Sequence, residues 1–247
     1  MFDCYFYLSL IGIIIVIYIW FVDKTSLEKS HVNPNLNIER ICLKSFLSPH
    51  EFSSISKNSC LIPSYLNGRT LETNYTTYFE YPNQDIYINR IYHNKSLPAV
   101  IRIRSYMHTT EKYLELKYNG VKIRGLLDSD NNLLSTENYK DKKILYKYLK
   151  EIKTGEIKPV VSNSYDRYSF TLNKYPDIRI TIDAHLMYDI KGSTYTFDQY
   201  IIELKIPKSY SQQDIDKINN YLKSQCGLHL DFVKFSKFDY GYTFIPH

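Results

Sequence analysis

The sequence predicts an α+β fold, a mainly antiparallel β-sheet with flanking helices, preceded by one N-terminal transmembrane helix. Several segments alternate charged with aliphatic residues, as strands with one apolar face do. Other segments repeat apolar residues at helical spacing behind capping residues, and the N-terminus is a long apolar run. The 247-residue chain contains no long linker after residue 37 and no internal repeat, so we expect one domain over residues 38–247.

The apolar run covers residues 5–22, which as a helix would extend about 27 Å, enough to span a bilayer core. It lacks the basic start and the small-residue cleavage site of a signal peptide, so we expect an uncleaved anchor over residues 1–24 and a polar linker over 25–37. Lys24 and Lys29 follow the run and no basic residue precedes it. The positive-inside rule therefore predicts a single-pass membrane protein with its domain in the cytoplasm.

Strands are predicted wherever the alternating pattern occurs. These segments are residues 73–80, 100–106, 113–117, 121–124, 160–170, 178–183 and 199–205. Asn119-Gly120 is typical of a hairpin turn. Residues 85–93 fit either a short helix or a strand, and residues 126–136 are predicted to be a loop.

Three helices flank these strands in the prediction. The first covers residues 48–56, with Ser48 as its N-cap and Pro49 in its first turn. The second covers residues 137–153 and ends before Gly155. The third covers residues 211–225, begins with a capping box and ends before a glycine.

The composition restricts the function. A net charge of +5 without a one-sided basic tail suits an anionic ligand, and we expect no nucleic acid. The four cysteines lack zinc-site spacing, so we expect reduced thiols in a reducing compartment. The sequence contains no phosphate-binding glycine loop, no dinucleotide fingerprint and no nucleophile elbow.

The alternating strands place their cations on one face. Arg102 and Arg104, for example, share a face because side chains alternate along a strand. The ordinary interpretation is a sheet face in contact with water. If the strands instead close with this face inward, the cations surround a cavity that needs an anion, and phosphate suits arginine and lysine. The cations are Arg102, Arg104, Lys117, Lys122, Arg124, Arg167 and Arg179.

Carboxylates are interspersed with these cations at Glu115, Asp183 and Glu203. A carboxylate in a phosphate site commonly holds a divalent metal that bridges phosphate oxygens, and its alternative role is a salt bridge to a neighbouring cation. We expect the metal role for Glu203 and favour the salt-bridge role for the other two.

Several short motifs occur in an order that resembles a known family. They are Arg102-Ile-Arg104 with Tyr106, Leu114-Glu-Leu-Lys117, Lys122-Ile-Arg124, Tyr165-Asp-Arg167, Arg179-Ile-Thr-Ile-Asp183, Glu203-Leu-Lys205 and Phe235-Ser-Lys-Phe238. Together they resemble the VTC domain, the polyphosphate polymerase domain of the vacuolar transporter chaperone complex, in the triphosphate tunnel metalloenzyme superfamily. The resemblance implies a closed antiparallel β-tunnel of about eight strands with a basic lumen.

The resemblance also implies an activity, namely transfer of the terminal phosphate of ATP to a growing polyphosphate chain with a divalent metal, Mn²⁺ or Mg²⁺. The implied catalytic residues, which bind the triphosphate and the product chain, are Arg102, Arg104, Lys117, Arg167, Arg179 and Lys237. Tyr165 is implied to contact phosphate and Glu203 to hold the metal. Lys122 and Arg124 compete for one further basic role, and Arg40 or Lys44 supplies the basic residue of the first strand.

Two alternatives stay open at this stage: a tripolyphosphatase or nucleoside triphosphatase on the same fold, and a non-catalytic polyphosphate-binding subunit. The expected partners are ATP, inorganic polyphosphate or pyrophosphate and a membrane, with a hetero-oligomer left open. We find neither the SPX domain nor the several membrane spans of eukaryotic polymerase subunits. The resemblance therefore gives no basis for expecting regulation by inositol phosphates or export of the product, and the implied tunnel chemistry is unaffected.

Overall fold

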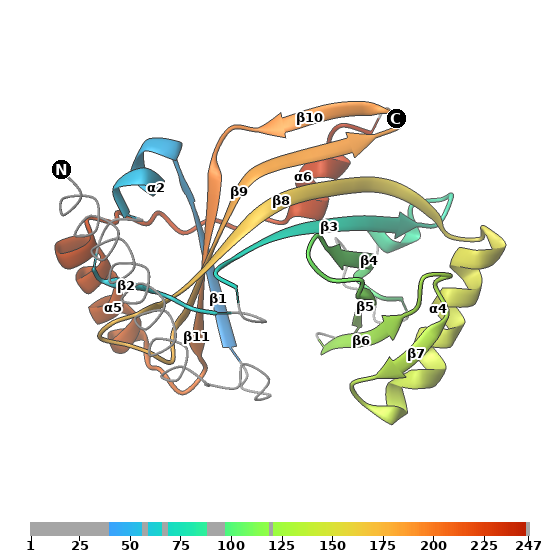
Figure 1. The fold of residues 1–247 in the computed structure, drawn as a ribbon, viewed down its shortest axis with the longest axis horizontal. Coiled ribbons are helices and arrows are strands. Elements are labelled where there is room, and N and C mark those ends of the chain that lie inside the picture. Colours follow the sequence, from blue (N-terminus) through green and yellow to red (C-terminus); the bar gives the residue numbers. More distant parts are fainter. Residues whose placement is uncertain (1–39, 56–58, 66–68, 88–96, 119–120, 246–247) are drawn as a thin grey trace, which may run out of the picture. The chain divides into compact units, whose positions relative to one another are not determined.

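The computed structural model describes residues 40–55, 59–65, 69–87, 97–118 and 121–245 (Figure 1). The predicted membrane anchor, the linker and the Asn119-Gly120 turn lie outside these ranges. No helix within the described residues has both the length and the apolar character needed to cross a membrane.

The centre of the fold is one antiparallel sheet, which confirms the predicted α+β class with a mainly antiparallel sheet. Its main path has the order β1-β11-β9-β8-β3-β4-β5-β6-β7, with β10 paired to β9 and β2 paired to β8. The strands are β1 (Arg40–Leu47), β2 (Leu61–Pro63), β3 (Leu71–Glu80), β4 (Val100–Tyr106), β5 (Lys112–Tyr118), β6 (Val121–Leu127), β7 (Leu133–Thr136), β8 (Lys158–Leu172), β9 (Arg179–Ile190), β10 (Ser193–Phe197) and β11 (Tyr200–Pro207).

The three predicted helices are present, the second of them as η1 followed by α4, and the structure adds α6. The helices are α2 (Pro49–Ile55), the 3-10 helix η1 (Tyr139–Asp141), α4 (Lys142–Thr154), α5 (Gln212–Cys226) and α6 (Lys237–Tyr242). The Ser211–Asp214 capping box starts α5, and Gly227, with a φ of 66°, ends it. Residues 85–87 are helical, so the described part of 85–93 is not a strand.

Two hydrophobic clusters lie on the same side of the sheet, which we call the outer face. The aliphatic residues of β1, β8, β9 and β11 pack with α2 and α5, with Ile182 and Leu204 fully buried. The aliphatic residues of β4, β5 and β6 pack with α4, with Leu114 and Leu116 fully buried. These residues are the aliphatic half of the alternating pattern, so the pattern identified the core correctly.

A third cluster lies on the opposite side, the inner face, at one end of the sheet. It joins Tyr78 of β3, Val100 of β4 and Ile201 of β11 to Phe238 and Tyr242 of α6, all of them buried. We call it the α6 cluster. Gly241 of α6 allows this close packing, because a Cβ atom there would lie 2.7 Å from a Val161 methyl group. The α6 cluster therefore fills one end of the inner face.

The sheet curls so that the inner face is concave. Lys117 of β5 and Cys42 of β1 stand six strands apart in the sheet order, about 29 Å in a flat sheet. The pKa of the Cys42 thiol is raised by burial and by Glu203, and the Lys117 charge is among those that oppose this shift. Figure 1 shows β3 and β8 as long curved strands connecting the two helix-covered parts.

The prediction of a closed tunnel is wrong for the described residues. The sheet order ends at β1 and at β7, and no pairing joins these two strands. The outer edge of β1 is instead approached by the C-terminal segment, where the Val233 amide donates to the Lys44 carbonyl at 2.8 Å. A strand edge that is already partly paired has fewer free groups for closing a barrel.

The prediction of reduced cysteines is also wrong for two of them. Cys60 and Cys226 form a disulfide between the start of β2 and the end of α5, with Cα atoms 5.8 Å apart. Both residues are buried in the α5 side of the core, where the fold brings them within disulfide range. Cys42 is free.

Candidate functional site

The strand register places the predicted site residues of the sheet on the inner face. Residues directly opposite each other in an antiparallel pair point to the same side. Lys44 is opposite Glu203, which is opposite Thr181, and Arg167 is opposite Asp183. Following directly opposite residues from β8 through β3, β4, β5 and β6 places the remaining residues on the same face. They are Tyr165, Arg102, Arg104, Lys117, Lys122 and Arg124. Arg179 belongs to the face through Lys205.

The first strand contributes both of its candidate residues. Arg40 and Lys44 are four residues apart on β1, so both point to the inner face. The Lys44 ammonium donates to the Phe235 carbonyl at 2.8 Å, which attaches the C-terminal segment to this strand. The pKa of Lys44 is lowered by burial and by Lys237, partly opposed by Glu203. Both candidates of the first strand therefore lie on the inner face, and the choice between them stays a prediction.

Glu115 is surrounded by cations, and we call this group the Glu115 cluster. The Glu115 carboxylate lies 2.6 Å from an Arg102 guanidinium nitrogen, 2.9 Å from the Lys122 ammonium and 3.3 Å from Arg124 Nε. Arg104 stands 3.8 Å away. Burial would raise the pKa of Glu115, but Arg102, Arg104 and Lys122 hold it well below its usual range. Glu115 thus takes the salt-bridge role and holds the arginines in place.

Asp183 is compensated as fully by a second set of cations. Arg167 donates two hydrogen bonds to its oxygens at 2.6 and 2.7 Å, and the Lys237 ammonium donates a third at 2.5 Å. Lys237 comes from the first turn of α6, where the Ser236 side chain accepts from the Asp239 amide. Burial would raise the pKa of Asp183, but Arg167 and Lys237 lower it strongly.

Tyr165 lies beside the Asp183 group. Its ring centroid is 4.5 Å from the Lys237 ammonium and 5.2 Å from the Arg167 guanidinium carbon. Its hydroxyl is buried and has no hydrogen-bond partner among the described atoms. A buried hydroxyl without a partner is costly, and next to these cations a phosphate oxygen would satisfy it.

Glu203 is held much more loosely than the other two carboxylates. Its nearest cation is Lys205, at 3.8 Å, and the described residues donate no hydrogen bond to it. Burial would raise the pKa of Glu203, but Lys205, Arg167, Lys44 and Lys237 lower it to about 2. Thr181, directly opposite, has a fully buried hydroxyl without a partner in the described structure. The Glu203 carboxylate is therefore ionised and available to another ligand.

The cations around Glu203 are under-compensated, and we call Arg40, Lys44, Arg179, Glu203 and Lys205 the Glu203 region. Burial lowers the pKa of Lys205 to about 8, with Glu203 opposing and Arg167 and Arg179 adding to the shift. The pKa of Arg179 is likewise lowered by burial, Arg167 and Arg40. Buried cations that repel one another mark a place where an anion would bind.

The residues fit a divalent metal that arrives with its phosphate ligand. The described residues contain no cluster of three or more His, Cys, Asp or Glu side chains that would hold an ion alone. Mg²⁺, however, is usually bound through one or two carboxylates together with substrate phosphates. Glu203 supplies one such carboxylate.

Sequence reasoning missed Lys205 and Tyr78 as site residues. Lys205 is two residues after Glu203 and shares its face, so the alternation that selected Glu203 also indicated Lys205. Tyr78 stands opposite Arg102, and its pKa is lowered by Arg102 and Arg104 although burial raises it. No sequence signal marked Tyr78, because only the pairing of β3 with β4 brings it to the arginines.

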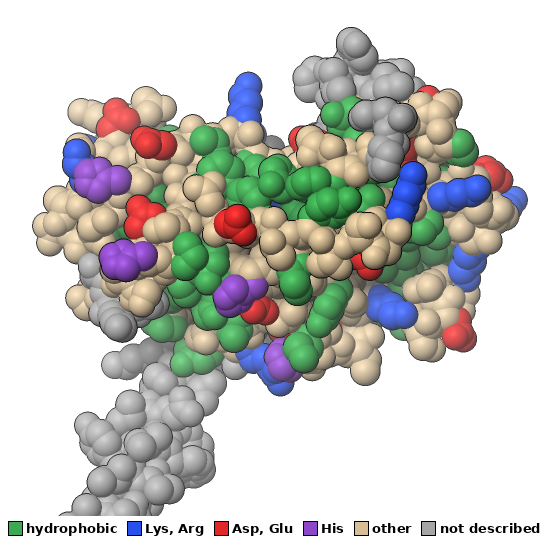
Figure 2. Space-filling view, turned by 90° about the horizontal axis from the view of Figure 1, so that it is seen from above, with side chains coloured by type: hydrophobic (Ala, Val, Ile, Leu, Met, Phe, Trp, Pro, Cys, Tyr) green, Lys and Arg blue, Asp and Glu red, His purple; other side chains and the backbone are tan. Residues whose placement is uncertain are grey.

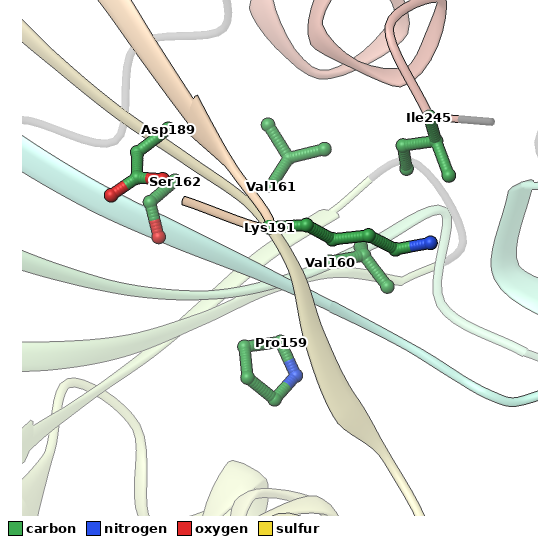
Figure 3. A pocket seen from close by; sticks show the side chains of 7 residues that line it. All are labelled: Pro159, Val160, Val161, Ser162, Asp189, Lys191 and Ile245. Carbon is green, nitrogen blue, oxygen red and sulfur yellow. The ribbon is translucent and has the colours of Figure 1, made fainter. Parts of the chain in front are cut away.

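One other face of the domain shows no such concentration of cations. Figure 2 looks onto β8, β9 and β10 from the side opposite α6, and its Lys and Arg side chains lie mainly at the margins, with hydrophobic side chains in the middle. A cavity of about 320 Å³ is lined by Pro159, Val160, Val161, Ser162, Asp189, Lys191 and Ile245 (Figure 3). None of its lining residues belongs to the predicted site.

Comparison with protein families gives a match over most of the chain. The family model of the VTC domain matches residues 29–245. Comparison with curated proteins gives no match.

Among solved structures, the PH1819 protein of Pyrococcus horikoshii is 16% identical with a TM-score of 0.48, over 82% of this chain and 96% of that one. A putative adenylyl cyclase from Hippeastrum, described as having a dominant triphosphatase activity, is 16% identical with a TM-score of 0.48, over 83% of this chain and 96% of that one. A putative adenylate cyclase from Vibrio parahaemolyticus is 11% identical with a TM-score of 0.47, over 83% of this chain and 98% of that one. At TM-scores below 0.5 these likenesses carry no conclusion about function.

Proposed function

The chain belongs to the VTC domain family, and from this premise we propose that it is a metal-dependent phosphotransferase that adds the terminal phosphate of ATP to a growing polyphosphate chain. The proposal is carried by one observation, the excess of cations over carboxylates on a concave face. The carboxylates of the Glu115 cluster and of Asp183 are saturated by their own cations, whereas the Glu203 region keeps cations in reserve. A long polyanion supplies the missing charge.

Each group on the inner face has a role in this reaction. Arginine binds phosphate bidentately, and the Glu115 cluster holds Arg102 and Arg104 in position for it. Arg167 and Lys237 are aligned by Asp183 beside the unpaired Tyr165 hydroxyl, so they would bind phosphate oxygens there. Lys44, Arg179 and Lys205 would neutralise further phosphates. No covalent nucleophile is required, because phosphoryl transfer depends mainly on positioning and charge neutralisation.

A divalent metal fits this scheme through Glu203, whose ionised carboxylate accepts no hydrogen bond from the described residues and has its nearest cation at 3.8 Å. When bound, the ion would neutralise charge on the phosphates of the nucleotide. Glu203 would hold it, and Lys205 and Lys44 would keep that carboxylate deprotonated.

A second candidate is a tripolyphosphatase or nucleoside triphosphatase, and the α6 cluster favours it. Phe238 and Tyr242 are each 2% exposed and fill one end of the inner face. A long product cannot leave through packed aromatic rings, whereas orthophosphate can leave by the way it entered. Water would then replace the phosphate chain as acceptor at the same site.

One assay separates these functions. The full chain is incubated with ATP and Mn²⁺ or Mg²⁺, and the products are resolved by gel electrophoresis and phosphate detection. We expect a polyphosphate ladder, and Glu203→Gln should lower its rate by at least about 100-fold. Glutamine keeps the size and the packing of the side chain.

The other outcomes are equally informative. Release of orthophosphate alone would replace the polymerase proposal by the hydrolase. Binding of polyphosphate that survives Glu203→Gln, with no turnover with either metal, would identify a non-catalytic binding subunit. Lys191→Gln, in the cavity of Figure 3, is the matched control and should leave the rate unchanged.

The location of the domain is a separate proposal. The charges around residues 1–24 favour a single-pass membrane protein with a cytoplasmic domain. The Cys60–Cys226 disulfide favours an oxidising compartment instead. Protease protection of the domain in sealed membranes distinguishes the two sides.

A further inference from the structure

Two tyrosines and an arginine form an ordered aromatic group on the inner face, which we call the tyrosine platform. The rings of Tyr106 on β4 and Tyr113 on β5 meet edge to face, with centroids 6.1 Å apart. The Arg124 guanidinium carbon lies 3.5 Å from the Tyr113 ring centroid, and its Nη2 donates to the Tyr106 hydroxyl at 2.9 Å. All three side chains are half-buried.

The platform lies at the end of the charged stretch away from the α6 cluster. Along β4 the inner-face residues run from Val100, inside the α6 cluster, through Arg102 and Arg104 to Tyr106. Tyr113 stands opposite Arg104, so it extends the same end on β5. The platform therefore adjoins the arginines of the Glu115 cluster.

The two ends of this stretch differ in what they can accept. The α6 end is filled by side chains that are already packed against one another. The other end presents half-exposed rings held in fixed orientation by Arg124. Aromatic rings and guanidinium planes stack on any nucleobase, because every base has a π-face.

We propose that the tyrosine platform is the nucleobase subsite of a nucleoside triphosphate whose phosphates lie along the inner face. This inference rests on the proposed function, since it needs the phosphate chain in that position. The base stacks on the Tyr113 ring and meets the Tyr106 ring edge-on, because the two ring planes are 74° apart, and the terminal phosphate points toward Arg102 and the α6 cluster. The substrate class is thus a nucleoside triphosphate, preferred over a linear phosphate of the same length.

The first test uses the unaltered full chain and two ligands that differ only in the base. Affinities for ATP and for ribose 5′-triphosphate are measured by calorimetry in the presence of Mg²⁺. Stacking of one base is worth about 1–3 kcal/mol, so ATP should bind roughly ten-fold tighter. Equal affinities would overturn the inference.

The second test alters the platform and compares ATP with inorganic tripolyphosphate. Tyr113→Ala should weaken ATP roughly ten-fold and tripolyphosphate less than about two-fold, whereas Tyr113→Phe should leave both unchanged. Tyr139→Ala is the matched control, because Tyr139 is 83% exposed and lies before α4. Tyr106→Leu gives a second variant if Tyr113→Ala does not fold.

The outcomes separate this inference from the proposed function. Equal weakening of both ligands by Tyr113→Ala would show a merely structural role and overturn the inference. Tripolyphosphate binding without any preference for ATP would overturn it too, while leaving the phosphate site intact. If the unaltered chain binds neither ligand, the proposed function fails and the nucleobase subsite fails with it.

Discussion

The Glu115 cluster and the Glu203 region use the same residue types on the same sheet face, yet they are compensated in opposite ways. Glu115 is 1% exposed and is approached by four cations, the closest at 2.6 Å. Glu203 has one cation within ion-pair distance, Lys205 at 3.8 Å. Within the described chain, the neighbouring Lys44 and Arg179 donate no hydrogen bond to a carboxylate.

The difference indicates a division of labour. A buried carboxylate saturated by cations keeps arginines fixed but has little capacity left for a ligand. A region with surplus cations and a free carboxylate is less stable by itself and gains most from an anion and a metal. In the proposed function, the first region would therefore orient the phosphate chain, and the second would provide most of the binding energy and the metal ligand.

The largest expected effect comes from removing the charge of each carboxylate in turn. Glu115→Gln leaves buried cations unpaired and should lower the free energy of unfolding by about 3–5 kcal/mol. Glu203→Gln should lower it by less than Glu115→Gln does, because Glu203 is approached by one cation at 3.8 Å whereas Glu115 is approached by four. Urea unfolding followed by circular dichroism measures both. Equal losses would mean that the two regions are not compensated differently.

A smaller effect is expected from pH, acting through Lys205. Its pKa in the folded protein is about 8, below the ordinary 10.5, mainly because of burial. Between these values the unfolded chain binds more protons than the folded one, so stability should rise with pH in that window. Affinity for tripolyphosphate should fall roughly ten-fold across the same window as the ammonium loses its charge.

Lys205→Arg distinguishes Lys205 from other titrating groups. Arginine stays charged at every pH of the experiment, so the variant should keep its affinity for tripolyphosphate above pH 8. An unchanged loss in this variant would assign the titration to another lysine, such as Lys122, whose pKa is also lowered by burial.

The smallest effect is expected at the rim of the Glu115 cluster. The Lys122 side chain is 47% exposed, so solvent screens its 2.9 Å ion pair with Glu115. Lys122→Gln should lower the free energy of unfolding by less than about 1 kcal/mol and weaken tripolyphosphate about two-fold. A loss as large as that of Glu115→Gln would place Lys122 among the structural members of the cluster.

Much of the fold could be predicted because the information was local. Alternation along a strand assigned Arg102, Lys117 and Glu203 to one face without knowledge of strand order. The strand over residues 178–183 was predicted too short, because β9 continues through His185, which has a φ of 51°. Its side chain contacts Asp166 at 3.0 Å beside a bulge in the β8–β9 register, and no local pattern announces such an irregularity.

The parts that could not be predicted depend on long-range pairing. The unclosed sheet, the Cys60–Cys226 bond and the approach of Val233 to β1 each join segments far apart in sequence. The choice between metal ligand and salt bridge for Glu115 depended on side chains from three strands. The spacing of residues in the sequence reveals neither the distance between two side chains nor whether neighbouring charges balance a carboxylate.

The pairing of β1 with β11 has a consequence for the order in which the protein forms during synthesis. The strands of the Glu115 cluster follow one another along the chain, so that cluster can fold soon after residue 127 leaves the ribosome. β1 can pair only after β11 has been synthesised, since Lys44 is opposite Glu203. Lys237, which donates to Asp183, is synthesised later still. We expect nascent chains to form the Glu115 cluster early, and to bind an anion only when translation is nearly complete.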